Sequence, residues 1–263
     1  MPYFKKTTRS GPLLEIEVYY SANQGRKLTR SANANPTVEE MVRENERNSQ
    51  KRQQRLAAAN FSYKHNDTFA TFTFAKPVDG EQIDKEIRNL FSRLRRKREK
   101  KHLKPLRAMA WAEKQSCWHI HILMNGGLTH SELKEIWGDR GRRIHMDTAD
   151  ELRDGFAGLI RYVNTEHKPK RGAQGEEAKE SVKQPRSKGK HRWHYTRNLI
   201  QPKVEKHEVN RRLFHKEPNA KKGYMLLPDY SNIDNNFGIY QYAAYVRLEE
   251  TETLERARSR KKE

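Results

Sequence analysis

The sequence predicts an α+β fold, with a largely antiparallel central sheet and flanking helices. Residues 68–74, TFATFTF, alternate threonine with aromatic side chains, which is typical of a strand. Residues 81–102 repeat apolar side chains at the spacing of an amphipathic helix. Segments 106–113 and 118–124 are predicted strands separated by a short turn. Strands that alternate with helices, and that include hairpin-type turns, favour an α+β arrangement.

The same two periodicities predict the remaining elements. Strand-like alternation marks residues 3–20, 142–147 and 237–248. Helices are predicted over 37–59, 129–137 and 151–165. The first two of these helices begin with T-x-x-E, at Thr37 with Glu40 and at Thr129 with Glu132, which is the sequence of a capping box.

Composition divides the chain into a main domain and peripheral segments. Residues 1–60 form an N-terminal strand and a polar helix, and residues 61–250 form the main domain. Within it, residues 168–190 are rich in Lys, Glu, Gly and Pro without periodicity, so we expect a mobile basic insertion. Residues 251–263 form a basic tail.

The charge of the chain points to an acidic partner. The 263 residues include 54 Lys and Arg against 34 Asp and Glu, a net charge of +20. Such a surplus attracts a polyanion, with nucleic acid as the first candidate and an anionic membrane surface as the alternative. No apolar stretch is long enough to span a membrane, and no signal peptide is recognisable. Cys117 is the single cysteine, which excludes a disulfide scaffold and favours a cytoplasmic location.

Three side chains form the strongest candidate site. His119 and His121 are two residues apart in a predicted strand, so they share one face of it. Glu113 ends the preceding strand across a short hairpin, and its carboxylate can complete a two-histidine, one-carboxylate metal site. Such a mixed N/O set suits Mn²⁺, whereas Mg²⁺ prefers oxygen ligands alone. Solvated strand histidines are the simpler alternative. A cupin-like oxygenase would need a glutamate a few residues downstream, but the nearest is Glu132.

A tyrosine near the end of a predicted helix is a second candidate. The phenol of Tyr162 is a poor nucleophile at neutral pH, but it can attack a phosphate that a metal ion polarises. The helical periodicity by itself favours a half-buried packing role for this side chain.

Motifs spread over residues 35–250 resemble those of a known family. TFATFTF, the His119-Ile120-His121 motif and the Tyr162 helix (GLIRYVNTE) occur in this order, followed by HRWHYTRNLIQPKV. They are similar to the three motifs of rolling-circle replication initiators. These proteins are HUH single-strand endonucleases encoded by plasmids and phages of Gram-positive bacteria.

The resemblance implies a fold, a site and an activity. The two histidines would lie on a central strand of an antiparallel sheet. His119, His121 and Glu113 would bind a divalent ion (Mn²⁺ or Mg²⁺), and Tyr162 would become linked to the 5′ end of nicked origin DNA. The 3′-hydroxyl would then prime a host polymerase. No Walker-type phosphate loop is present, so a host helicase would open the duplex. A conjugative relaxase, a transposase or a non-catalytic basic nucleic-acid-binding protein are the alternatives.

The chain departs from the family pattern beside the proposed nucleophile. Thr165 occupies the position where the family usually has a lysine, and Lys168 is the nearest lysine that follows. Three explanations remain open. Lys168 reaches the scissile phosphate from a frayed helix end, another basic residue takes the place of the family's lysine, or the protein has weak or no nicking activity. Tyr195 is the fallback nucleophile, although on a predicted strand it is better placed to support the sheet or stack on DNA.

Basic residues near these motifs are the candidate phosphate contacts. They are Arg93, Arg95, Arg96, Lys97, Arg142, Arg143, Arg161 and Lys168. The alternative for the 93–101 run is a solvated helix end, since cations stabilise the C-terminus of a helix. Phe61, Trp111 and Trp118 can stack on unpaired bases, but core packing is the better interpretation of each. His145 is an undecided ligand or general base.

Overall fold

The computed structural model describes residues 3–20, 38–61, 66–80, 82–114, 118–148, 193–210, 218, 221–227, 231–235 and 238–248. These residues form an α+β structure with two antiparallel sheets and three α-helices, which confirms the predicted class. The helices are α1 (Val38–Asn60), α2 (Ile83–Lys100) and α3 (His130–Trp137), with a 3₁₀ turn at Gly138–Arg140. The strands are β1 (Tyr3–Ser10), β2 (Leu13–Tyr20), β3 (Thr68–Phe74), β4 (Ala108–Lys114), β5 (Trp118–Met124), β6 (Gly141–Thr148), β7 (Trp193–Tyr195), β8 (Lys203–Val209), β9 (Tyr224–Leu226), β10 (Ser231–Asn235) and β11 (Gly238–Arg247).

The chain divides into two compact units. The split unit contains Met1–Tyr63 and Ile200–Glu263, and the continuous unit contains Lys64–Leu199. These boundaries differ from those expected at residues 60 and 250, because the strands after residue 203 pair with the strands of the N-terminal hairpin. None of the described helices has the length and apolarity needed to cross a membrane.

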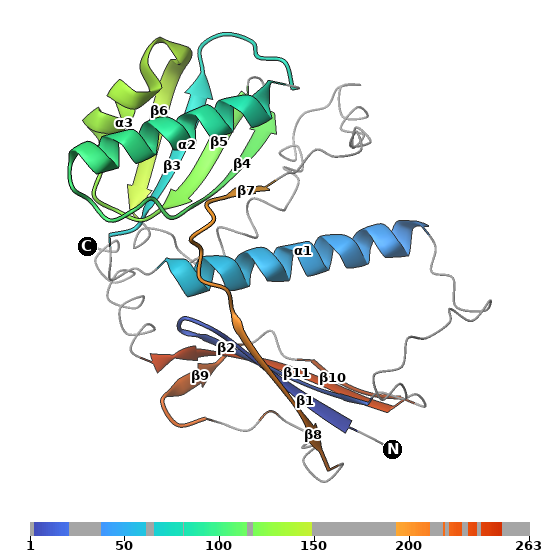
Figure 1. Ribbon diagram of the computed structural model, residues 1–263. Coiled ribbons are helices and arrows are strands. Elements are labelled where there is room, and N and C mark those ends of the chain that lie inside the picture. Colours follow the sequence, from blue (N-terminus) through green and yellow to red (C-terminus); the bar gives the residue numbers. More distant parts are fainter. Residues whose placement is uncertain are drawn as a thin grey trace, which may run out of the picture. The chain divides into compact units, whose positions relative to one another are not determined.

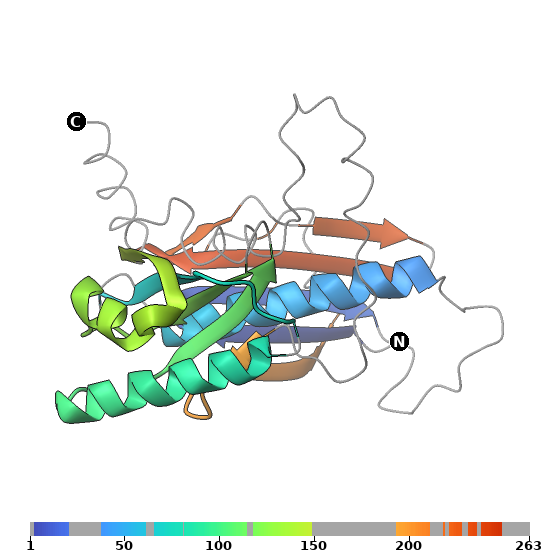
Figure 2. The ribbon, with the colours of Figure 1, turned by 90° about the horizontal axis from the view of Figure 1, so that it is seen from above.

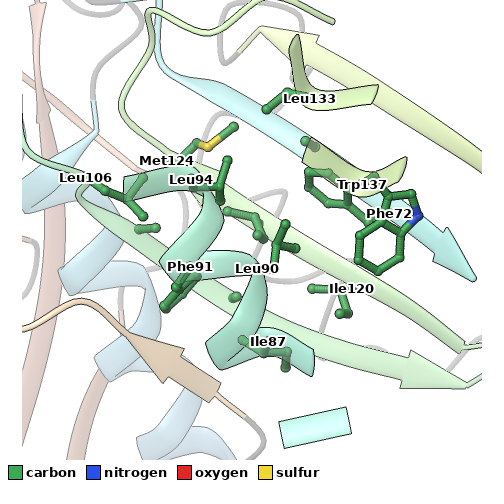
Figure 3. Packing of buried hydrophobic residues seen from close by; sticks show 14 of the residues in the cluster. Phe72, Ile87, Leu90, Phe91, Leu94, Leu106, Ile120, Met124, Leu133 and Trp137 are labelled. Carbon is green, nitrogen blue, oxygen red and sulfur yellow. The ribbon is translucent and has the colours of Figure 1, made fainter. Parts of the chain in front are cut away.

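The continuous unit holds a five-stranded sheet with β5 at its centre. The strand order is β6-β3-β5-β4-β7, and each neighbouring pair is antiparallel. Helices α2 and α3 cover one face of this sheet (Figure 1). The fully buried core between these helices and the sheet includes Phe72, Leu90, Leu94, Ile120 and Trp137 (Figure 3).

The start of α3 is the capping box that the sequence predicts. Thr129 accepts a hydrogen bond at its side chain from the backbone N–H of Glu132, and the Glu132 carboxylate accepts one from the backbone N–H of Thr129. Glu132 also forms an ion pair with Lys101, 2.8 Å away. This ion pair, together with the hydrogen bonds from Thr129, lowers the pKa of Glu132 to about 2.

The low pKa of Glu132 predicts a pH-dependent contribution to stability. A carboxylate whose pKa is depressed on folding stabilises the protein above its unfolded-state pKa of about 4.5, and this contribution fades as the pH falls towards 2. We expect Glu132→Gln to lower the unfolding free energy by about 0.5–1 kcal/mol at neutral pH, since the exposed pair is screened by solvent. In denaturant titrations, the difference should shrink below pH 4.5 and vanish only near pH 2, where the folded-state carboxylate is itself protonated; a constant difference would contradict the assignment.

The split unit contains a second sheet, onto which α1 packs. Its path is β10-β11-β2-β1-β8, with β9 added to β11. Figure 2 shows α1 lying over the strands of this sheet. The stretch 3–20, predicted as strand-like, is a hairpin that turns at Gly11, where φ is +57°. A Cβ at Gly11 would also collide with the carbonyl of Ala58 in α1, so two independent constraints require glycine there.

A buried ion network joins α1 to this sheet. Arg55 of α1 donates to Glu15 at 2.6 and 3.1 Å and to Glu17 at 3.1 Å, and Tyr242 donates to Glu15 at 2.9 Å. Burial and the charge of Glu15 raise the pKa of the Tyr242 phenol, so it stays protonated and continues to donate. Leu14 and Glu15 point to opposite faces of β2, yet both are buried, and the Glu15 carboxylate is bonded to Arg55 of α1.

Candidate active site

The sheet of the continuous unit has one face covered by α2 and α3 and a second face that carries polar side chains together with buried apolar ones such as Phe69 and Trp111. Side chains alternate along a strand, so the residues between the core positions of β3 and β5 face away from α2 and α3. Strand register places seven residues in two neighbouring rows on this second face, which we call the histidine face. They are Thr71, Thr73, Trp111, His119, His121, Arg143 and His145.

Both candidate metal-binding histidines are hydrogen-bonded to threonines of β3. The Nδ1 atom of His121 lies 2.9 Å from the hydroxyl of Thr71, and that of His119 lies 2.9 Å from the hydroxyl of Thr73. Each threonine stands directly opposite its histidine in the β3–β5 register. The alternation of TFATFTF therefore places two hydroxyls at the spacing of the two imidazoles.

Each of these hydrogen bonds can be made by either tautomer of the imidazole, and the tautomer decides what the histidine can bind. Where Nδ1–H donates to the threonine oxygen, Nε2 keeps its lone pair, and this is the tautomer that ligates a metal ion. Ligand histidines in proteins typically have their second ring nitrogen held in this way. The centroids of the His119 and His121 rings lie 6.2 Å apart on one face. In the Nδ1–H tautomer, the two Nε2 atoms have the chemistry of ligands for a divalent ion.

Aromatic rings fix the plane of His121. The ring is stacked against Trp111, with centroids 5.0 Å apart, and against Phe69 at 5.9 Å. Trp193 of β7 packs on the other side of Trp111 at 4.7 Å. His121 is 7% exposed and Trp111 is 2% exposed, so the imidazole has little freedom to rotate. The packing role favoured for Trp111 and Phe61 agrees with their burial, and Trp118 packs partly buried against the core.

The third predicted ligand is placed by register. Glu113 is the direct partner of His119 across the β4–β5 pair, and directly paired positions lie on the same face of a sheet. The structure describes the backbone of Glu113 but not its side chain. Among the side chains that are described, no three of His, Cys, Asp and Glu gather as a metal-binding group.

Two further cationic or titratable residues lie on the histidine face. Arg143 of β6 stands opposite Thr73, in the row of His119, and its side chain is exposed. His145 stands opposite Thr71, in the row of His121, and is also exposed. Both side chains are thus accessible to a ligand that lies across β6 and β3. Of Arg142 only the backbone is described.

The predicted basic stripe on α2 separates into groups with different partners. Arg93 lies over the ring of Trp137 at 5.8 Å, and burial together with the charge of Arg140 lowers the pKa of its guanidinium. Lys97 pairs with Glu135 of α3 at 2.6 Å, which raises the pKa of the Lys97 ammonium. Arg95 and Arg96 are exposed. Of the four residues predicted on α2 as phosphate contacts, Arg95 and Arg96 are therefore the more available.

Arg98 within the same run is a structural residue. It is 2% exposed and donates from Nε to the carbonyl of Lys104, and from Nη1 to the carbonyls of Asn125 and Gly126, each at 2.9 Å. These bonds tie the end of α2 to the loop that follows it and to the end of β5. The sequence pattern, which shows only an arginine among other cations, does not distinguish this residue.

The candidate nucleophiles are placed unequally. Tyr162, Arg161, Thr165 and Lys168 lie outside the described residues, as does the predicted helix 151–165. Tyr195 is on β7, opposite Met109 of β4, and its ring is stacked on Trp193. Strand β7 is two strands from β5, about 10 Å at the usual spacing. Tyr195 therefore lies on the edge strand of the sheet, away from His119.

The threonines are the functional candidates that sequence reasoning missed. In the sequence, Thr71 and Thr73 indicate only a strand, although their spacing of two residues matches that of the histidines.

Comparison of the chain with known proteins finds no matching family model, no similar curated protein and no similar solved structure.

Proposed function

We propose that this protein is a metal-dependent single-strand DNA endonuclease and ligase of the HUH type, which initiates rolling-circle replication through a covalent 5′-phosphotyrosine. One observation carries the proposal: two imidazoles lie on one face of a central strand, each held at Nδ1 by a threonine hydroxyl. The net charge of +20 and the exposed Arg143 beside this face fit a DNA substrate.

His119 and His121 would hold the divalent ion, with Glu113 as the third candidate ligand. When bound, such an ion supplies Lewis-acid polarisation of the scissile phosphate. Thr71 and Thr73 orient the imidazoles, and Trp111 with Phe69 exclude water from one side of His121. These are the parts of the proposed site that the described residues supply.

Tyr162 is the proposed nucleophile. Its phenolic oxygen forms a bond to phosphorus and loses its proton, while the bond between phosphorus and the 3′ oxygen breaks. The departing 3′ oxygen takes up a proton and becomes a free hydroxyl, which a host polymerase extends. The phosphotyrosine ester conserves the energy of the phosphodiester bond, so the reverse reaction can join DNA ends without ATP.

The decisive experiment is a search for the covalent adduct. The protein is incubated in Mn²⁺ with 3′-labelled single-stranded oligonucleotides that tile the DNA on both sides of its gene, and is then resolved under denaturing conditions. We expect a protein–DNA adduct with the native chain and a loss of at least ~10³-fold with Tyr162→Phe. Tyr195→Phe is the matched control and should retain the adduct.

Three outcomes would change the proposal. An adduct that persists in Tyr162→Phe and disappears in Tyr195→Phe would move the nucleophile but keep the activity. An adduct that persists in His119→Ala/His121→Ala would remove the metal from the mechanism. DNA binding without any adduct would leave a non-catalytic basic nucleic-acid-binding protein.

A further inference from the structure

A cavity of about 960 Å³ lies beside α2, within the continuous unit and away from the histidine face. One wall is formed by Arg88, Ser92, Arg95 and Glu99, whose spacing of four, three and four residues marks a single side of the helix. The other wall is the segment 194–198, which continues β7. Neither His119 nor His121 lines this cavity, whereas Tyr195, the fallback nucleophile, does.

The cavity is strongly basic. Arg88, Arg95 and Arg197 line it with exposed side chains, and within the described part of the chain none of them forms an ion pair with a carboxylate. Glu99 is the one carboxylate among the lining residues. Arg98 also lines the cavity, but its bonds to backbone carbonyls already hold it. Three guanidinium groups are therefore available to an anionic ligand.

The wall that carries Arg197 is held rigidly. The backbone N–H of Thr196 donates to the carbonyl of Ala108 at 3.0 Å, and the Thr196 hydroxyl accepts from the N–H of Ala108 at 3.0 Å. His194 Nε2 lies 2.9 Å from a carboxylate oxygen of Asp84 on α2. Arg197 and Asn198 form an exposed turn between these anchors and the buried Leu199, so the site is organised before any ligand binds.

The spacing of the cations indicates the class of ligand. Arg88 and Arg95 are seven residues apart, about 10 Å along a helix axis, so their exposed side chains can each hold a separate phosphate. Phe91, Leu103 and Leu106 supply apolar surface beside these cations, and the Arg95 guanidinium lies 5.9 Å from the centre of the Phe91 ring. Phe91 and Leu106 are themselves largely buried, so it is the separated cations that point to a nucleic-acid strand, because they match its repeated phosphates.

We propose that this cavity binds a segment of single-stranded nucleic acid, with successive phosphates at Arg88, Arg95 and Arg197. The inference rests on the nucleic-acid-binding part of the proposed function, and it is independent of the metal ligands and of the nucleophile. It adds a second contact region for the strand, in which Arg88 and Arg197 are contacts that the sequence motifs do not suggest.

The test is fluorescence anisotropy of a labelled twelve-nucleotide thymidine oligomer bound to the full chain over a range of salt concentrations. The cavity variant is Arg88→Gln/Arg95→Gln/Arg197→Gln. The control variant, Lys76→Gln/Lys85→Gln/Lys134→Gln, removes the same charge from exposed positions outside the cavity. We expect the cavity variant to bind at least ~10-fold more weakly and the slope of log K against log salt to fall by about 2, at about 0.7 per lost phosphate contact. The control should change affinity by less than ~3-fold.

Equal affinity and salt slope in the two triple variants would overturn the inference. A competition experiment with thymidine monophosphate gives a second check. If the mononucleotide displaces the oligomer at a concentration close to the oligomer's dissociation constant, the cavity is a mononucleotide pocket and the inference is wrong. If the triple variant melts at a lower temperature, Arg88→Gln and Arg197→Gln are compared singly with Lys85→Gln. A cavity-dependent slope without a Tyr162 adduct would support the cavity and refute the nuclease. A Tyr162 adduct, together with oligomer binding that does not change in the cavity variant, would support the nuclease and refute the cavity.

Discussion

Thr71→Val/Thr73→Val is expected to weaken Mn²⁺ binding by about 10²–10³-fold, while the fold is retained. Valine has the shape of threonine but lacks the hydroxyl that holds Nδ1 of His121 and His119. Loss of such a supporting hydrogen bond typically costs 10–100-fold in metal affinity. Isothermal titration calorimetry measures the affinity. Long-range ¹H–¹⁵N spectra of the metal-free protein at mildly alkaline pH show which ring nitrogen carries the proton.

Thr68→Val provides the matched control for this experiment. Thr68 lies on the same strand but at an even position, on the face opposite to Thr71 and Thr73. In the native chain and in this control, Nδ1 of both histidines should carry the proton. In the double variant, the spectra should show a mixture of tautomers. Mn²⁺ affinity within twofold of the control would show that the threonines do not position the ligands.

Arg98→Met is expected to destabilise the continuous unit by about 3–5 kcal/mol. The substitution keeps an unbranched apolar stem but leaves the carbonyls of Lys104, Asn125 and Gly126 without this donor, and the bond to Asn125 is fully buried. Hydrogen bonds from a charged donor contribute about 1.5–3 kcal/mol each, and unpaired buried acceptors add a penalty. Chemical denaturation followed by circular dichroism measures the change.

Arg96→Met is the control for Arg98→Met. Arg96 lies on the same helix but is exposed, so its replacement should change stability by less than about 0.5 kcal/mol. Arg98→Lys should recover only part of the stability, because an ammonium group is not a planar fork that reaches several carbonyls at once. Equal losses of stability at positions 96 and 98 would mean that the hydrogen bonds from Arg98 to the three carbonyls do not stabilise the fold.

Local sequence signals predicted the elements well where one segment carries its own pattern. The strand predicted at 68–74 is β3 with the same bounds, and α2 lies within the predicted 81–102. The capping box at Thr129 forms as expected. The i, i+2 spacing of His119 and His121 is sufficient to place them on one face.

Features that depend on distant partners were not accessible in this way. The bond between Thr71 and His121 needs the register of two strands whose contacting residues are 50 positions apart. The different roles of Arg93, Lys97 and Arg98 depend on Trp137, Glu135 and backbone carbonyls that helical periodicity does not reveal. The burial of Glu15 likewise depends on Arg55 of α1.

The pairing of β2 with β11 has a consequence for synthesis of the chain. Residues that become partners, such as Leu14 and Tyr245, are separated by nearly the whole sequence. Closing so long a loop is slow. During synthesis, Leu14 leaves the ribosome long before Tyr245 is added to the chain. The hairpin must therefore wait with an unpaired strand edge, while residues 64–199 can complete their own sheet. Premature termination before residue 238 would leave that edge permanently open, and such truncated chains should aggregate.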